Sequence, residues 1–204
     1  MVRNKQLNEQ MRQQSRERIL AAARKLFAEK GYFNCTVSDI VKAAEMSQGN
    51  LYWYFPGKEE LLKAVLAEGF ERVETVLVEA NAYPAPTQEK VERLVDSYLA
   101  YLEEGGEFNA IFLSILGHGG GAFIQELGFD TVAIGMRYHQ ILWPLLEQAR
   151  QEGLVDDCEP NYLGVFFFSL FNGFLLTYRD GLSLVPAEQF KQAVLRMLGA
   201  TWVR

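Results

Sequence analysis

Cysteine and histidine are scarce in this chain, and their scarcity excludes several classes of protein. The 204 residues include two cysteines, Cys35 and Cys158, and two histidines, His118 and His139. Two thiols exclude a disulfide-built scaffold and suit a reducing compartment such as the cytoplasm. They leave open either two unrelated thiols or a redox-sensing pair. Because neither histidine has clustered cysteine or carboxylate neighbours in the sequence, we expect no metal site, and no cofactor is indicated.

We expect neither a secretory signal nor a membrane-spanning apolar run in this chain. Residues 1–15 are polar and basic, without the apolar core and small-residue cleavage site of a signal peptide. We expect them to form a flexible basic arm. The most apolar stretch, residues 161–178, is interrupted by Asn172, and its continuous apolar part is too short to favour a membrane span. The sequence therefore predicts a cytoplasmic protein with no membrane partner.

Charge is divided unevenly along the chain, whose formal net charge is −6. Residues 1–63 hold 11 Lys and Arg against 7 Asp and Glu, whereas residues 64–204 hold 9 against 19. A basic N-terminal part on an acidic protein favours local attraction to phosphate without general coating of nucleic acid.

That basic part contains two short helices joined by a tight turn, within residues 36–58. Thr36 is a good N-cap, and Asp39 is placed to bond back to the cap amide. Ser47 caps the second helix, which Pro56 ends. This pattern predicts a helix-turn-helix, in which the second helix enters the major groove of DNA.

The 100° step of a helix divides the side chains of that second helix into two faces. Leu51, Tyr54 and Phe55 face the protein, and the opposite face is polar and aromatic. The alternative is an ordinary solvated helix, but an exposed aromatic pair indicates an interaction surface. Side-chain amides can pair with adenine edges, and hydroxyl and ammonium groups can bind phosphate. The predicted DNA-binding residues are Thr36, Ser47, Gln48, Gly49, Asn50, Tyr52, Trp53 and Lys58.

A third helix is expected ahead of these two, capped by Ser15 and ending at Lys30 before Gly31. Its apolar positions follow the helical period. Residues 16–57 are therefore predicted to form a three-helix DNA-binding domain, followed by a larger domain over residues 58–204.

Residues 19–62 (ILAAARKLFAEKGYFNCTVSDIVKAAEMSQGNLYWYFPGKEELL) resemble the tetracycline-repressor (TetR) family of bacterial transcription regulators. The resemblance implies an N-terminal reader on a variable helical domain that dimerises and holds a small-molecule inducer. It also implies phosphate contacts for Thr36, Tyr52 and Lys58. Gln48, Gly49 and Asn50 match the base-reading end.

Three positions depart from the family pattern. Trp53 stands where histidine is common, Cys35 where threonine is common, and Gly57 where a serine cap is common. None breaks the motif, but the preferred base sequence does not transfer.

The remainder of the chain shows helical periods throughout, so the predicted fold class is all-α. Helices are expected over residues 58–80, 87–102, 108–116, 123–151 with a bend at Pro144, 161–178 and 186–203. The glycine cluster 117–121 superficially fits an esterase oxyanion loop or a dinucleotide fingerprint. No G-x-S-x-G elbow and no βαβ unit accompany it, so we interpret it as a connection between helices and predict no enzyme.

Two further surfaces are predicted in this body. Residues 161–178 are apolar on nearly all sides, which favours a dimer over burial within one chain. The predicted interface residues are Phe166, Leu170, Phe174, Tyr178, Phe190, Val194, Met197 and Trp202. Aromatic side chains with a few polar groups are typical of a ligand pocket, although such stripes are also ordinary core. The predicted pocket residues are Phe112, His118, Phe123, Tyr138, His139, Trp143, Phe167, Phe171 and Asn172.

These patterns together predict a ligand-responsive transcriptional regulator that acts as a homodimer. The leading hypothesis is a repressor released from a palindromic operator in double-stranded DNA by a small apolar or aromatic effector. Two alternatives stay open: a helical small-molecule-binding enzyme, and a constitutive DNA-binding protein without an effector.

Overall fold

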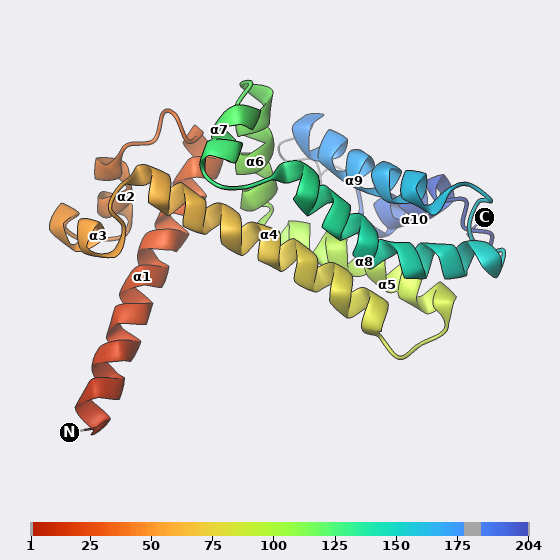
Figure 1. Cartoon of the computed structure of the whole chain (residues 1–204), viewed down its shortest axis with the longest axis horizontal. Coiled ribbons are helices and arrows are strands. Elements are labelled where there is room, and N and C mark those ends of the chain that lie inside the picture. The colour runs from red at the N-terminus through yellow and green to blue at the C-terminus, as the bar shows by residue number, and fades with distance from the viewer. Residues whose placement is uncertain (1, 178–184, 204) are drawn as a thin grey trace.

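The computed structural model describes residues 2–177 and 185–203, and within these ranges the chain consists of helices and connecting turns without a strand (Figure 1). The helices are α1 (Val2–Lys30), α2 (Val37–Ala43), α3 (Gln48–Tyr54), α4 (Lys58–Ala82), α5 (Thr87–Gly105), α6 (Glu107–Gly117), α7 (Gly121–Glu126), α8 (Thr131–Gln151), α9 (Pro160–Thr177) and α10 (Ala187–Met197). The all-α fold class is confirmed. Tyr178, a predicted interface residue, lies outside the described residues.

The molecule is elongated, with α2 and α3 beside α1 at one end and α9 and α10 toward the other (Figure 1). Helix α4 runs from the first group into the second, where it packs on α5 and α8. Helix α1 packs on α6 as well as on α2 and α4. The N-terminal group therefore packs on the body mainly through α4 and α6.

The N-terminal group has a small apolar core to which α1, α2 and α3 all contribute. Leu20, Phe27, Ile40 and Leu51 are fully buried there. The turn between α2 and α3 passes through Glu45, whose positive φ of 54° lets the chain reverse sharply. This packing fixes the orientation of the two short helices, which are too short to be stable alone.

Helix α1 is longer than predicted. It begins at Val2, whereas a start after Ser15 and a flexible arm over residues 1–15 were expected. Residues 2–14 contain no proline or glycine and are rich in good helix formers, so nothing interrupts the helix. The side-chain amide of Gln13 donates to Glu17 one turn later at 2.9 Å, across the expected boundary.

The body has an aromatic core centred on Tyr98 of α5. Its ring centroid lies 4.7 Å from that of Phe171, 5.2 Å from that of Phe167 and 5.7 Å from that of Tyr101. All four side chains are buried. Part of the apolar surface of α9 is therefore buried within the chain itself.

The segment predicted as one helix over residues 123–151 is two helices, which corrects that prediction. Gly128 has a φ of +92°, a conformation that ends α7. The carboxylate of Asp130 then accepts from the amides of Val132 and Ala133 at 3.0 Å and caps α8. Pro144, expected to bend or divide the helix, lies inside α8.

The helices that the structure describes include none with the length and apolar character needed to cross a membrane.

Candidate functional site

A complete capping box begins α2. The amide of Asp39 donates to the Thr36 hydroxyl oxygen at 3.1 Å, and the amide of Thr36 donates to the Asp39 carboxylate at 3.0 Å. The hydroxyl of Thr36 also donates to that carboxylate at 2.9 Å. These bonds from Thr36, together with Lys30 at 3.2 Å, lower the pKa of Asp39 to about 2. The predicted cap is confirmed, and Thr36 remains exposed at the start of the helix.

Helix α3 begins at the predicted cap, where Ser47 accepts from the amide of Asn50 at 3.2 Å. Leu51 and Phe55 are buried against α1 and α2 as predicted. The opposite face is open to solvent: Tyr52 is 50% exposed and Trp53 is 61% exposed. Gln48, Gly49 and Asn50 are exposed as well. The helix thus presents side-chain amides, a hydroxyl and an indole on one free surface.

The extended α1 contacts that surface, which was not foreseen from the sequence. The guanidinium carbon of Arg12 lies 5.0 Å from the ring centroid of Trp53. One turn on, the guanidinium of Arg16 lies 5.3 Å from the ring of Phe55. A cation over an aromatic face is attracted by the ring quadrupole. The sequence signal for this contact is the composition of residues 2–14, which favours an unbroken helix and so extends α1 to include Arg12.

Lys58 has a different environment from the one predicted. Its ammonium donates to the carbonyls of Tyr32 at 3.0 Å and Cys35 at 2.9 Å, and lies 4.3 Å from the Tyr32 ring centroid. The turn between α1 and α2 leaves these carbonyls without helical partners, and the first residue of α4 reaches them. In this conformation Lys58 holds the turn and does not extend freely toward phosphate.

The nine predicted pocket residues occupy several environments. Phe167 and Phe171 belong to the buried core around Tyr98. The hydroxyl of Tyr138 donates to the carbonyl of Phe70 at 2.9 Å. Phe112 stacks on Phe108, with centroids 5.8 Å apart.

Two of the pocket residues, His118 and Phe123, lie beside the turn that follows α1. The Phe123 ring is 5.5 Å from Tyr32 and 5.9 Å from Phe33, and the His118 ring is 6.3 Å from Phe33. The His118 Nδ1 atom is 2.7 Å from the carbonyl oxygen of Ser114. These aromatic contacts join the N-terminal group to the body.

His139 and Trp143 lie instead on the outer side of α8. With Met136, Tyr162 and Val165 they line a shallow groove of about 440 Å³ between α8 and α9. Asn172 is half-buried on α9. The structure therefore separates His139 and Trp143 from the buried Phe167, and the pocket as predicted stays a prediction.

The predicted interface residues also divide. Phe166 is 50% exposed and Met197 is exposed, whereas Leu170, Phe174 and Trp202 are half-buried. Phe190 and Val194 are buried within the chain, which corrects their assignment to an open surface. They face inward because α10 packs on α5, where Lys191 binds Asp96 at 2.8 Å.

An exposed apolar surface does follow α8 and α9; it includes Phe166, a predicted interface residue, and Trp143, a predicted pocket residue, and its other members were not predicted. Its large side chains are Val132, Met136, Trp143, Tyr162, Val165 and Phe166. Apolar residues on two adjacent helices form a surface of the kind that binds another protein.

The comparisons with known proteins agree with this architecture. Residues 19–65 match the family described as bacterial regulatory proteins, tetR family. The HTH-type transcriptional regulator UidR of Escherichia coli (strain K12) is 31% identical over 107 residues, which are 52% of this chain and 53% of UidR. HbdR of Aromatoleum sp. (strain CIB), also an HTH-type transcriptional regulator, is 33% identical over 92 residues, 44% of this chain and 38% of HbdR. The chain spans about half the length of UidR, or less for HbdR.

Solved structures match over most of the chain. PfmR, a TetR family transcriptional regulator from Thermus thermophilus, has a TM-score of 0.73 at 23% identity, covering 89% of this chain and 96% of PfmR. Salmonella enterica GusR has a TM-score of 0.67 at 28% identity, covering 90% and 93%. The fold is therefore that of a helix-turn-helix domain on a helical body. The resemblance to the tetR family of bacterial regulatory proteins is confirmed over residues 19–65.

Proposed function

We propose that this chain is a DNA-binding transcriptional regulator that acts as a homodimer and responds to a small ligand. The simplest form of this function is a repressor that leaves its operator when the ligand binds. The observation that carries the proposal is the free outer face of α3, with Gln48, Asn50, Tyr52 and Trp53 exposed on a helix whose other face is buried.

The chemistry of that face suits a DNA major groove. Gln48 and Asn50 are at the N-terminal end of α3, where base contacts are made by recognition helices, and their amides can read adenine. Gly49 has no side chain to hold the backbone away from the bases. The hydroxyl of Tyr52, and those of Thr36 and Ser47 at the two helix starts, supply phosphate contacts.

Dimerisation is supported by the exposed apolar surface on α8 and α9. Val132, Met136, Tyr162, Val165 and Phe166 are large apolar residues exposed on this surface. A second copy related by a two-fold axis would cover the same surface on both chains and place two α3 helices on one side of a duplex. A near-palindromic operator follows from that symmetry.

Response to a ligand is supported by fold similarity and by the contacts between the two parts of the chain. FadR of Bacillus subtilis, whose structure is described in complex with stearoyl-CoA, has a TM-score of 0.70 at 21% identity and covers 90% of this chain and 97% of FadR. We propose an apolar or aromatic effector that favours a conformation in which the two readers are wrongly spaced. The curated relatives named here are transcriptional regulators, so no enzymatic activity is proposed.

The decisive experiment has two stages. A genome-wide map of DNA bound by the tagged protein identifies operators, and fluorescence anisotropy then measures affinity for one operator and one scrambled duplex over a salt series. We expect operator affinity to fall steeply with salt, because phosphate contacts release counterions. Absence of any salt-sensitive operator binding contradicts the proposal.

A pair of variants locates the surface. Tyr52→Ala is expected to weaken operator binding several-fold while sedimentation shows an unchanged oligomer. Tyr83→Ala, which removes another exposed tyrosine from the turn after α4, is the matched control and should bind as the unaltered protein does. Equal losses in both variants would place the DNA contact elsewhere.

A further inference from the structure

The exposed face of α3 is interrupted at Gly49, which carries no side chain. Apart from its two neighbours in the chain, a Cβ atom added at this residue would meet only the hydroxyl oxygen of Ser47, at 4.0 Å. Trp53 is four residues further along the same helix, and residues at this spacing are neighbours on a helix surface. The open space over Gly49, bordered by Trp53, is called the Gly49 gap below.

The indole ring beside the gap is held from two directions. The ring of Tyr54 meets it edge-on, with centroids 4.6 Å apart and ring planes at 89°. The guanidinium of Arg12, from α1, lies 5.0 Å from the centroid of the Trp53 ring. Most of the Trp53 side chain is nevertheless exposed. A ring that is already placed loses little conformational freedom on binding, so its free surface is well suited to recognition.

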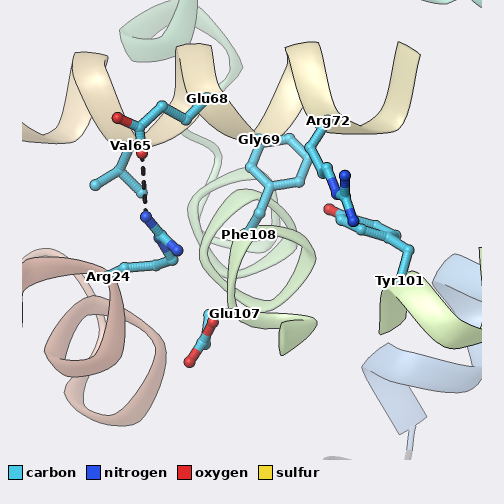
Figure 2. A pocket seen from close by; sticks show the side chains of 8 residues that line it. All are labelled: Arg24, Val65, Glu68, Gly69, Arg72, Tyr101, Glu107 and Phe108. Carbon is cyan, nitrogen blue, oxygen red and sulfur yellow. Dashed lines mark hydrogen bonds and ion pairs between the residues drawn. The ribbon is translucent and has the colours of Figure 1, made fainter. Parts of the chain in front are cut away.

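The helix that carries Arg12 is itself anchored to the body. Figure 2 shows the guanidinium of Arg24, further along α1, bonded to the carboxylate of Glu68 on α4, and this distance is 3.1 Å. In the same view the Phe108 ring of α6 lies against Gly69 of α4, where a side chain of any size would collide with it. Arg12 therefore belongs to a helix that is fixed to α4, and not to a free arm.

The chemistry of the gap favours an apolar group. It is bounded by a turn of backbone and by an indole, and the nearby Ser47 hydroxyl is occupied in the helix cap, where it accepts from the amide of Asn50 at 3.2 Å. Among the bases of DNA, thymine is the one that presents a methyl group in the major groove. The space left by a missing side chain next to an aromatic ring fits a group of that size.

We infer that the Gly49 gap receives the 5-methyl group of one thymine in each operator half-site, and that Trp53 is the residue that selects it. Gly49 gives the methyl group room to approach the backbone, and the indole of Trp53 covers it from the side. Arg12 is a positioning residue, because it acts on the base through the ring that it holds. This inference rests on the proposed function, since it assigns one base feature to the DNA-binding surface proposed above.

The first test changes only the DNA. Each thymine of the mapped operator is replaced in turn by deoxyuridine, which lacks the 5-methyl group, and fluorescence anisotropy measures affinity at constant salt. At one thymine of each half-site we expect binding to weaken roughly fourfold, the effect of one buried methyl group, and roughly sixteenfold when both half-sites are changed. At the same position, 5-methylcytosine should bind more tightly than cytosine. Equal binding of thymine and uracil at every position overturns the inference.

The second test connects the methyl group to the gap. Trp53→Ala should weaken binding of the thymine operator and bring the thymine-to-uracil affinity ratio at this position to about one. Trp53→Phe keeps an apolar ring without the indole N–H, so it should keep most of the ratio. Gly49→Ala places a methyl group in the gap itself, so it should weaken binding of the thymine operator more than that of the uracil operator. Its Tm should not fall, because the added Cβ meets no close atom and alanine favours a helix.

Tyr52→Phe is the matched control on the same helix. It removes a phosphate-binding hydroxyl, so it should weaken binding of the thymine and uracil operators by the same factor. Arg12→Ala should lower the thymine-to-uracil ratio, and Arg12→Lys, which keeps a cation beside the ring, should retain more of it. A merely structural role for Arg12 would change both affinities and leave the ratio as it is.

The outcomes separate the inference from the proposed function. If an operator is bound and neither Trp53→Ala nor Gly49→Ala changes the thymine-to-uracil ratio, the inference fails and the proposed function stands. An equal loss for both operators in Trp53→Ala assigns the indole to the sugar–phosphate backbone, and it overturns the inference in the same way. If no operator is bound at any salt concentration, the proposed function fails and the inference fails with it.

Discussion

The two parts of this molecule use apolar side chains in different ways. In the N-terminal group, each helix has one face toward a single small core, and buried Leu51 is followed directly by half-exposed Tyr52. In the body, α9 is apolar on several sides, and half-exposed Phe166 is followed by Phe167 at 1% exposure. In both pairs an exposed residue is adjacent to a buried one, but on α9 both the exposed and the buried residue are apolar. Periodicity therefore identifies the buried face of α3 and leaves that of α9 undecided.

The largest effect is expected from truncating a side chain in the core of the body, which tests the difference between the buried and exposed sides of α9. Phe171→Ala should lower the free energy of unfolding by about 3–5 kcal/mol, because a fully buried ring next to Tyr98 is lost. Phe166→Ala, on the same helix, should leave the core intact and weaken self-association. Urea denaturation and sedimentation velocity measure the two effects. Similar stability losses in both variants would mean that the exposed side of α9 is part of the same core.

In the N-terminal group the matching pair is Leu51→Ala and Tyr52→Ala. Leu51→Ala should cost about 2–5 kcal/mol of stability, because it leaves a void between the three helices. Tyr52→Ala should change stability by less than about 0.5 kcal/mol, as is usual for surface substitutions. Thermal denaturation by circular dichroism checks both. A large loss for Tyr52→Ala would assign that ring to the fold and not to a free surface.

A smaller effect is expected where α1 contacts α3. The contact between Arg12 and Trp53 should contribute about 0.5–1 kcal/mol, the range for exposed cation–π pairs. A double-mutant cycle of Arg12→Ala and Trp53→Ala measures the coupling free energy, with Gln14→Ala as an exposed control on the same helix. A coupling of zero would show that the N-terminal turns of α1 are independent of α3.

The smallest effect concerns the acid side of the capping box. The pKa of Asp39 is lowered to about 2 in the folded chain, against about 3.9 for an unfolded aspartate. A lowered folded pKa means that the stabilising contribution is present above about pH 4 and is lost as the pH falls toward 2. Asp39→Asn should therefore differ from the unaltered protein in unfolding midpoint at pH 6 and converge with it near pH 2. A constant difference across this range would contradict the assignment.

The sequence predicted the parts of the site that depend on local chemistry. The caps at Thr36 and Ser47 follow from residue type and spacing within one turn of helix, and the structure confirms both. The break at Gly128 and Asp130 has the same kind of local signal, a glycine followed by an N-cap residue, although the apolar period continues across it. The DNA contacts, the pocket and the domain boundaries remain predictions.

Other features depend on side chains that meet across long distances in the chain. Lys58 reaches two carbonyls more than twenty residues earlier, and Tyr101 meets Arg24 and Arg72 only because α1, α4 and α5 converge. Neither of these long-range contacts produces a periodic pattern in the sequence from which it could be predicted. Arg12 combines the two cases. The helix that contains it follows from local composition, but its contact with Trp53 depends on how α1 packs beside α3.

Helix α4 has 25 residues, so it is a rod about 37 Å long at 1.5 Å per residue. Its first residue, Lys58, donates a hydrogen bond to the turn after α1, and Gly69, near the middle of the helix, packs against the Phe108 ring. A tilt of about 5° about that midpoint would move the Lys58 end by roughly 1.6 Å over a half-length of about 18 Å. If two copies tilt in opposite senses, the displacement doubles. The contact between Gly69 and the Phe108 ring would then act as a pivot, at which a small change in the tilt of α4 gives a larger change in the distance between the two DNA-binding groups.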